Sequence, residues 1–275
     1  MKYVDINNSK VSVIGIGTHL IGGKENADYS KDDLYIELIK EAVKLGVNHI
    51  DTSEIYANGH TEEIIGQAIN GFDRKDLFIA SKVWKDNLKH DDLINSLSLS
   101  LKRLNTDYLD LYYIHWPNPS IDLKETIITL EQLKDSGKIK NIGLSNFSFS
   151  QIKEASSFLK SSKIDAIQLE HNLINRCSND ILSFCRNNKI TFVAYKPLCK
   201  GAILKSGNNI LESLSYKYKK SKAQIALNWL INQDNIITIP KISRIEHLKD
   251  NIDSINFKLE NDDYNKLNET DFTNN

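Results

Sequence analysis

Four side chains suited to proton transfer lie in or just after short apolar segments of the sequence: Asp51, Tyr56, Lys82 and His115. A tyrosine phenol has a pKa of about 10 and donates a proton poorly unless a nearby ammonium favours its charged form. Lys82 could supply that ammonium, and a buried lysine needs a counter-ion such as Asp51 to stay charged. His115 could hydrogen-bond the same substrate oxygen. Together these groups would polarise and protonate a carbonyl, and a hydride-donating cofactor would complete a reduction.

The elements that must position these groups alternate along the whole chain. Short apolar runs are typical of parallel strands that are buried on both faces. We expect eight such strands, at 11–18, 48–53, 77–83, 109–115, 139–146, 166–172, 191–198 and 236–242. Amphipathic segments with a helical period lie between them, at 32–46, 91–105, 123–137, 148–159, 179–188, 210–232 and 244–252.

This alternation predicts an α/β fold, a (β/α)8 TIM barrel in which residues 1–275 form one domain. The polar NNS at 7–9, which follows KYVDI, predicts a short β-hairpin before the barrel. An open, doubly wound sheet is the rival fold. Its GxGxxG fingerprint is absent from the sequence, and only GIG at 15–17 matches part of it.

The composition argues against several classes of partner. Charged residues make up 26% of the chain, and 35 basic against 36 acidic residues leave a net charge of −1. Without excess positive charge or an apolar run of about 18 residues, we expect neither nucleic acid nor a membrane as a partner. An N-terminus without an apolar leader and three scattered cysteines (Cys177, Cys185, Cys199) favour the reducing cytoplasm. No cluster has metal-ligand spacing, so we predict no metal.

In such a barrel the active site lies at the carboxyl ends of the strands. Besides the four groups named first, the predicted strand ends carry Ser145, Asn146, Gln168, Tyr195, Lys196 and Lys241. Taken singly, each has a structural explanation: Asp51 could cap a turn, and His115 could be a buried, satisfied histidine. Their collection at one predicted rim favours a functional site.

The sequence resembles the aldo-keto reductase family of NADPH-dependent barrel oxidoreductases over almost its whole length. The resemblance rests on GIGT (15–18), HIDTSEIYANGHTEEIIGQAI (49–69), IASKVW (79–84), DLYYIHWP (110–117), GKIKNIGLSNFS (137–148), QLEHNL (168–173), AYKPL (194–198) and IPK (239–241). It implies that Asp51, Tyr56, Lys82 and His115 are the catalytic tetrad of an NADP-dependent aldehyde or ketone reductase.

The resemblance also implies a set of cofactor contacts. Tyr195 would stack on the nicotinamide, whose carboxamide Ser145, Asn146 and Gln168 would hold. Lys241, Ser243, Arg244 and Asn251 would bind the adenosine 2′-phosphate, which favours NADPH, with NADH possible. His247 stands where members often have arginine, and Ile242 where many have serine. The remaining implied contacts are Gly17, Thr18, Asp51, Lys196, Pro197 and Leu198.

The resemblance implies a small carbonyl substrate, which would be bound by Tyr56, Trp84, His115 and Trp116. It also implies that the protein is a monomer or a weak oligomer. The polar segment 259–275 stands where many members carry a pocket-narrowing loop, so we expect an open pocket. Two alternatives stay open. One is a Schiff-base aldolase that uses Lys82 or Lys196, and the other is a non-catalytic NADP-binding sensor or accessory subunit.

Overall fold

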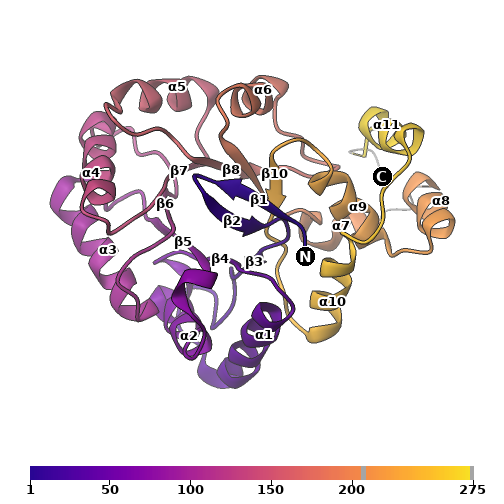
Figure 1. The fold of residues 1–275 in the computed structure, drawn as a ribbon, viewed down its shortest axis with the longest axis horizontal. Coiled ribbons are helices and arrows are strands. Elements are labelled where there is room, and N and C mark those ends of the chain that lie inside the picture. Colours follow the sequence, from indigo (N-terminus) through magenta and orange to yellow (C-terminus); the bar gives the residue numbers. More distant parts are fainter. Residues whose placement is uncertain (206–208, 273–275) are drawn as a thin grey trace.

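The computed structural model describes residues 1–205 and 209–272 and consists of a hairpin followed by a closed parallel barrel (Figure 1). The antiparallel hairpin pairs β1 (Tyr3–Ile6) with β2 (Ser9–Ser12). The barrel strands follow in chain order, each parallel to the next: β3 (Ile16–Gly17), β4 (His49–Asp51), β5 (Phe78–Val83), β6 (Leu111–Ile114), β7 (Ile142–Ser145), β8 (Ala166–Glu170), β9 (Thr191–Tyr195) and β10 (Ile236–Thr238).

The first and last barrel strands meet, which decides between the two candidate folds. The backbone N–H of Gly15 donates to the Thr238 carbonyl at 2.8 Å, and a parallel bridge joins Gly17 to Lys241. A side chain at Gly17 would place its Cβ 2.5 Å from the Ile239 carbonyl oxygen, so the seam requires glycine. The predicted (β/α)8 barrel with an N-terminal hairpin is confirmed, and the open sheet is wrong.

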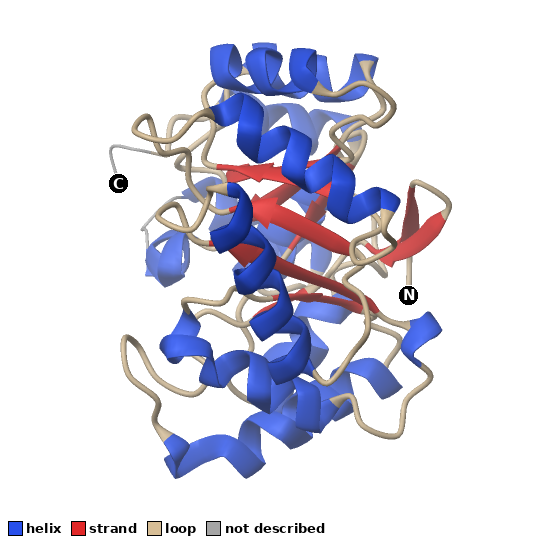
Figure 2. Ribbon diagram, turned by 90° about the vertical axis from the view of Figure 1, so that its left-hand side faces the viewer, coloured by secondary structure: helices blue, strands red, loops and turns tan. Residues whose placement is uncertain are grey.

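Helices surround the strands, and the hairpin lies at one end of the barrel (Figure 2). The α-helices are α1 (Asp32–Lys44), α2 (His60–Ala68), α3 (His90–Leu104), α4 (Leu123–Asp135), α5 (Phe149–Phe158), α6 (Asn179–Asn187), α7 (Ala202–Lys205), α8 (Asn209–Tyr218), α9 (Lys222–Ile231), α10 (Ile245–Asp253) and α11 (Asn261–Glu269). Short 3-10 turns are η1 (Tyr29–Lys31), η2 (Tyr56–Gly59), η3 (Arg74–Asp76) and η4 (Cys199–Gly201). Within the described ranges no helix has the length and apolar character needed to cross a bilayer.

Several helical assignments differ from the sequence expectation. Two helices, α2 (His60–Ala68) and the short α7 (Ala202–Lys205), lie where no helical segment is predicted. The single helix expected at 210–232 is two helices, because Lys219 has a φ of 52° and Ser221 starts a new capping box with Gln224. The polar segment after residue 259 forms α11, which buries only Asp263 and Leu267. This segment has so few apolar residues that its sequence shows no helical period.

The alternation of side chains along β5 explains how a lysine comes to lie inside the barrel. Phe78 and Ala80 belong to the interior core, whereas Ile79 and Val83 pack against the surrounding helices. Lys82 continues the inward set because successive strand residues point to opposite faces. The hairpin closes the amino end of this interior, where Ile6 and Val11 join the same core. These further residues complete the interior core: Val13, Ile14, Leu111, Tyr113, Ala166, Val193, Ile231, Ile237 and Ile239.

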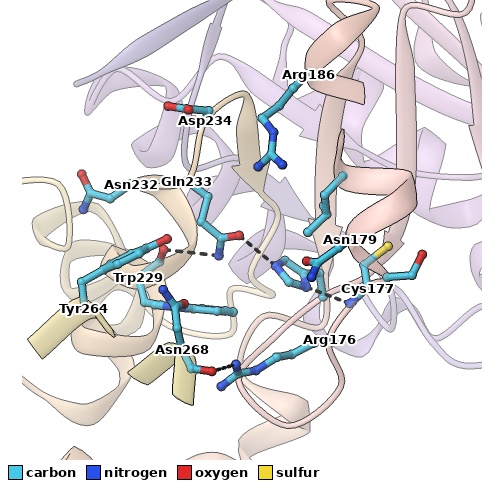
Figure 3. A pocket seen from close by; sticks show the side chains of 13 residues that line it. Arg176, Cys177, Asn179, Arg186, Trp229, Asn232, Gln233, Asp234, Tyr264 and Asn268 are labelled. Carbon is cyan, nitrogen blue, oxygen red and sulfur yellow. Dashed lines mark hydrogen bonds between the residues drawn. The ribbon is translucent and has the colours of Figure 1, made fainter. Parts of the chain in front are cut away.

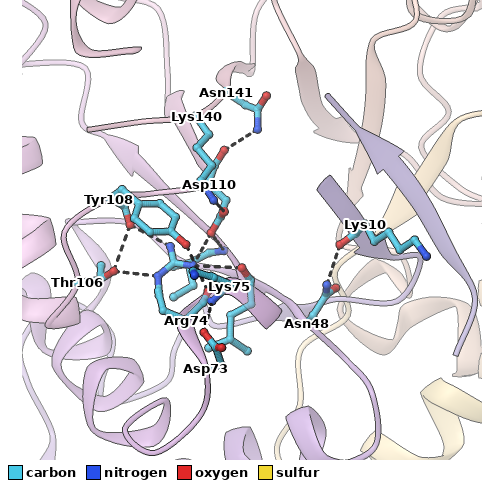
Figure 4. Close-up of polar contacts among 12 residues, drawn as sticks. Lys10, Asn48, Asp73, Arg74, Lys75, Thr106, Tyr108, Asp110, Lys140 and Asn141 are labelled. Atoms are coloured by element: carbon cyan, nitrogen blue, oxygen red, sulfur yellow. Dashed lines mark hydrogen bonds and ion pairs between the residues drawn. The ribbon is translucent and has the colours of Figure 1, made fainter. Parts of the chain in front are cut away.

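A polar network ties β5 and β6 together where these strands begin (Figure 4). The carboxylate of Asp110 lies 2.7 Å from Nη1 of Arg74 and 3.1 Å from Nζ of Lys140, and it accepts the Ile79 N–H at 3.0 Å. Both cations also lie over the Tyr108 ring, with the Arg74 guanidinium 4.1 Å and the Lys140 ammonium 4.0 Å from its centre. At this end of a barrel such a network serves stability rather than catalysis.

Replacing Asp110 should therefore destabilise the protein without changing its chemistry. Asp110→Ala leaves two cations and a buried N–H without their acceptor, and we expect the free energy of unfolding to fall by about 3 kcal/mol. Urea denaturation measures this change, and kcat of the folded fraction should be unaltered. Asp107→Ala, at an exposed neighbouring position, is the control and should leave stability within about 0.5 kcal/mol. Equal urea midpoints for Asp110→Ala and Asp107→Ala would contradict a stabilising role for the Asp110 network.

Candidate active site

Asp51 and Lys82 form a buried ion pair inside the carboxyl end of the barrel. Nζ of Lys82 lies 2.5 Å from Oδ1 of Asp51 and donates to the Thr52 carbonyl at 2.7 Å. The amide of Gln168 donates to the other carboxylate oxygen at 2.7 Å. Burial alone would lower the pKa of Lys82, but the Asp51 carboxylate and the Tyr56 oxygen together outweigh burial, and this pKa is raised. The ammonium therefore stays charged at neutral pH although the side chain is fully buried.

Tyr56 opens the turn η2 after β4, and its ring lies beside Lys82. Nζ of Lys82 is 5.3 Å from the centre of the phenol ring. The turn is tight because Ala57 and Asn58 both have positive φ, 48° and 55°. Burial raises the pKa of Tyr56, and Lys82 opposes this only in part. The net shift is opposite to the lowering expected from the sequence, so the phenol carries its proton at neutral pH.

His115 follows β6 and presents its ring to the same space. Tyr56 and Trp84 meet this ring edge-on, with ring centres 5.8 and 5.4 Å away. Its Nδ1 lies 3.0 Å from Oγ of Ser53. Burial, followed by the charge of Lys82, lowers the pKa of His115 to about 2. The imidazole is therefore neutral at physiological pH and can donate one hydrogen bond without adding a second cation beside Lys82.

Hydrogen bonds join three strand ends, those of β6, β7 and β9, through His115, the pair Ser145 and Asn146, and Tyr195. The Tyr195 hydroxyl donates to Oδ1 of Asn146 at 2.7 Å. Nδ2 of Asn146 donates to the His115 carbonyl at 2.9 Å and to Oγ of Ser145 at 3.0 Å. Asn146 has a φ of 63°, in a region that asparagine tolerates better than most residues. The amide thus fixes the aromatic ring of β9 relative to the strand end that carries His115.

Cations gather at the same rim. Burial lowers the pKa of His19, and the charges of Lys241, Lys82, Lys200 and Lys196 lower it further, so all four lysines lie near enough to act on this imidazole. Lys196 pairs with Glu170 at 2.8 Å. Neither Lys200 nor Lys241 has a carboxylate in contact among residues 1–205 and 209–272. Unbalanced positive charge beside an amide, a hydroxyl and an aromatic ring suits a ligand that carries both phosphates and a flat ring.

Comparison with known proteins places this geometry in a family. The sequence model that describes the aldo/keto reductase family matches residues 13–271 of this chain. The chain belongs to the aldo/keto reductase family. It is 33% identical over 242 residues to the methylglyoxal reductase YeaE of Escherichia coli (strain K12). The aligned region covers 86% of this chain and 83% of YeaE.

Solved structures show the same likeness over the whole fold. A thermostable aldo-keto reductase, Tm1743, solved in complex with the inhibitor epalrestat, superposes with a TM-score of 0.94 and 42% identity, over 97% of this chain and 98% of that one. An aldo-keto reductase from Klebsiella pneumoniae in complex with NADPH superposes with a TM-score of 0.88 and 29% identity, over 96% and 92% of the two chains.

The segment after β10 of this aldo/keto reductase forms a compact polar cluster. Nε and Nη2 of Arg244 donate to Nε2 of His247, at 2.9 and 2.7 Å, and Oγ of Ser243 lies 3.3 Å from Nδ1 of the same ring. His247 thus holds Arg244 in position. Asn251 lies within α10 and is buried.

Other predicted residues of this aldo/keto reductase fall into different environments. Thr18 donates its hydroxyl to the Asp51 carbonyl at 2.8 Å, so it braces the strand that carries the carboxylate. Trp84 contacts His115, whereas Trp116 is 43% exposed at the rim. Gly17 lies in the seam of the barrel, and Lys196, Pro197 and Leu198 form the loop after β9, where Lys196 has a φ of 49°.

Two residues at this site were missed in the sequence. His19 packs edge-on against the Tyr56 ring, with ring centres 5.2 Å apart. Its position directly after Thr18, at the end of the first apolar run, could have indicated it. Ser53 contacts His115, and nothing in its local sequence context distinguishes it from an ordinary turn serine.

A cavity of about 690 Å³ lies outside the barrel, between α6, α9 and α11 (Figure 3). Its polar groups bond to one another: His171 contacts Gln233 at 3.2 Å, and Nη2 of Arg176 donates to the Leu267 carbonyl at 2.6 Å. None of the tetrad residues lines it. The Arg176 bond fastens α11 to the segment that follows β8, and we assign the cavity a structural role.

Proposed function

We propose that this aldo/keto reductase reduces small aldehydes or ketones to alcohols with NADPH. The observation that carries the proposal is the meeting of a protonated phenol, a charged ammonium and a neutral imidazole around one space at the carboxyl end of the barrel. When bound, NADPH supplies the hydride for the carbonyl carbon.

The four residues then have separate tasks. Tyr56 gives its proton to the carbonyl oxygen as negative charge develops there. Lys82, kept charged by Asp51, stabilises the phenolate that Tyr56 leaves behind. His115 donates a hydrogen bond to the same oxygen and orients the carbonyl. Trp84 and Trp116 border the substrate, so compact carbonyls such as methylglyoxal are the first substrates to test.

The donor groups at the rim fit the cofactor. Ser145, Asn146 and Gln168 would hold the carboxamide, and the ring of Tyr195 would support the nicotinamide. Lys241, Ser243, Arg244 and Asn251 would take the 2′-phosphate, because charged and hydroxyl donors suit phosphate oxygens. Gly17, Thr18, Lys196, Pro197 and Leu198 complete the proposed contacts. We further propose a cytoplasmic protein in which residues 1–275 act as one unit, as a monomer or weak oligomer.

The aldolase alternative finds no support in the geometry. A Schiff base requires an uncharged amine, whereas Lys82 is held charged by Asp51 and Lys196 pairs with Glu170. The decisive assay follows loss of the reduced nicotinamide absorbance with methylglyoxal and other aldehydes. Oxidation of NADPH that depends on the aldehyde supports the reductase. Tight NADPH binding without turnover of any carbonyl would support the sensor alternative instead.

Cofactor preference tests the phosphate contacts. Arg244→Leu should raise the KM for NADPH roughly tenfold or more, since a hydrogen bond to a charged group is worth about 1.5–3 kcal/mol. The KM for NADH, which lacks the 2′-phosphate, should stay unchanged. Lys249→Met removes an exposed charge from α10, the helix that begins directly after Arg244, and is the matched control. An equal rise of the KM for NADPH and for NADH in Arg244→Leu would contradict a contact between Arg244 and the 2′-phosphate.

A further inference from the structure

We propose that Ser53 is a positioning residue that sets the tautomer of His115, so that Nε2 carries the proton and faces the substrate oxygen. The inference rests on the proposed function and adds a residue outside the tetrad. It concerns a single proton, because a neutral imidazole has one N–H and only that nitrogen can donate.

Ser53 is fully buried, and its hydroxyl lies between two acceptors. Oγ is 3.0 Å from Nδ1 of His115 and 3.2 Å from the Lys82 carbonyl oxygen. A hydroxyl has one proton to donate. If Ser53 donates to Nδ1, the ring proton resides on Nε2. If Ser53 donates to the carbonyl instead, Nδ1 must carry the ring proton and Nε2 presents a lone pair.

Two features favour donation to Nδ1. The contact to Nδ1 is the shorter of the two, and the Lys82 carbonyl keeps a second donor, the Glu54 backbone N–H at 3.4 Å. Nδ1 has no other hydrogen-bond partner within the described part of the chain. In the opposite arrangement the lone pair of Nε2 would face the lone pairs of a carbonyl oxygen, and His115 could not stabilise the developing charge.

The tautomer can be observed without any turnover. Long-range proton–nitrogen correlation spectra of histidine-labelled protein distinguish protonated from bare ring nitrogens, and a His115→Gln variant identifies the His115 signals. We expect a protonated Nε2 and a bare, hydrogen-bonded Nδ1. A protonated Nδ1 in the wild-type protein would overturn the proposal. Because the readout needs no substrate, it separates this inference from the reductase assignment.

Kinetics provide the second readout. Ser53→Ala should lower kcat for aldehyde reduction about tenfold, the size expected for one lost hydrogen bond, with the NADPH dissociation constant unchanged. The Nδ1 signal should lose its hydrogen-bonded character. Ser53→Thr keeps the hydroxyl and should restore both readouts. Ser96→Ala, which removes a buried hydroxyl from α3, is the control for stability. Unaltered kcat and tautomer in Ser53→Ala would refute the role.

Discussion

Tyr56→Phe is expected to lower kcat for aldehyde reduction by about 10³-fold while NADPH still binds, because general acid catalysis contributes about 10²–10⁴-fold. The substitution removes one oxygen and keeps the ring that packs against His19 and His115. Since the raised pKa keeps Tyr56 protonated at neutral pH, the wild-type phenol has a proton to transfer, and it is a far stronger acid than the N–H of a neutral imidazole such as His115.

Steady-state kinetics with methylglyoxal and fluorescence titration with NADPH separate the two effects. Tyr216→Phe is the matched control, because it deletes the same oxygen from a ring that is 78% exposed. Full activity in Tyr56→Phe would assign the proton to another group, and His115 would be the next candidate.

Lys82→Met should impair both turnover and stability. Without the ammonium the pKa of Tyr56 rises further, the phenol becomes a weaker acid, and we expect kcat to fall about 10²–10⁴-fold. The buried Asp51 also loses its counter-ion, which should cost about 3–5 kcal/mol of the free energy of unfolding. In the reverse reaction, alcohol oxidation needs the phenolate, so its pH profile should move to higher pH.

A double variant distinguishes the catalytic role of Lys82 from its structural role. Asp51→Asn combined with Lys82→Met removes both charges and retains an oxygen for the Gln168 amide. Stability should recover, because no unpaired charge remains buried, whereas kcat should stay low. Recovery of kcat together with stability would show that Lys82 only balances the charge of Asp51.

The sequence predicted the positions of the tetrad better than their electrostatics. Lys82 stood out because it interrupts an apolar run, and the period of two along β5 confirmed that it points inward with Phe78 and Ala80. The direction of the Tyr56 pKa was not predictable, because it depends on how deeply the turn η2 is buried. The role of Ser53 was equally hidden, since its partner His115 lies 62 residues away.

The helical differences at 210–232 and after residue 259 have different causes, one local and one tertiary. At 210–232 the amphipathic pattern of the sequence continues without interruption, but the helix itself is broken. The break depends on the positive φ of Lys219 and on the N-cap at Ser221. α11 is held by contacts from elsewhere, including Arg176 on its last carbonyls, and these tertiary contacts leave no periodic pattern in its own sequence.

The alternation along β5 also limits how this protein could diversify. Ser81 points outward and donates to Glu62 of α2 at 2.6 Å, while its neighbour Lys82 points inward to Asp51. Insertion or deletion of one residue between Phe78 and Lys82 would exchange these two environments, because a register slip turns every side chain to the other face. Changes of length that preserve the chemistry are therefore confined to the connecting loops. A new substrate range would therefore arise from insertions and deletions in those loops. The strands that carry the reacting side chains would tolerate substitutions but no change of length.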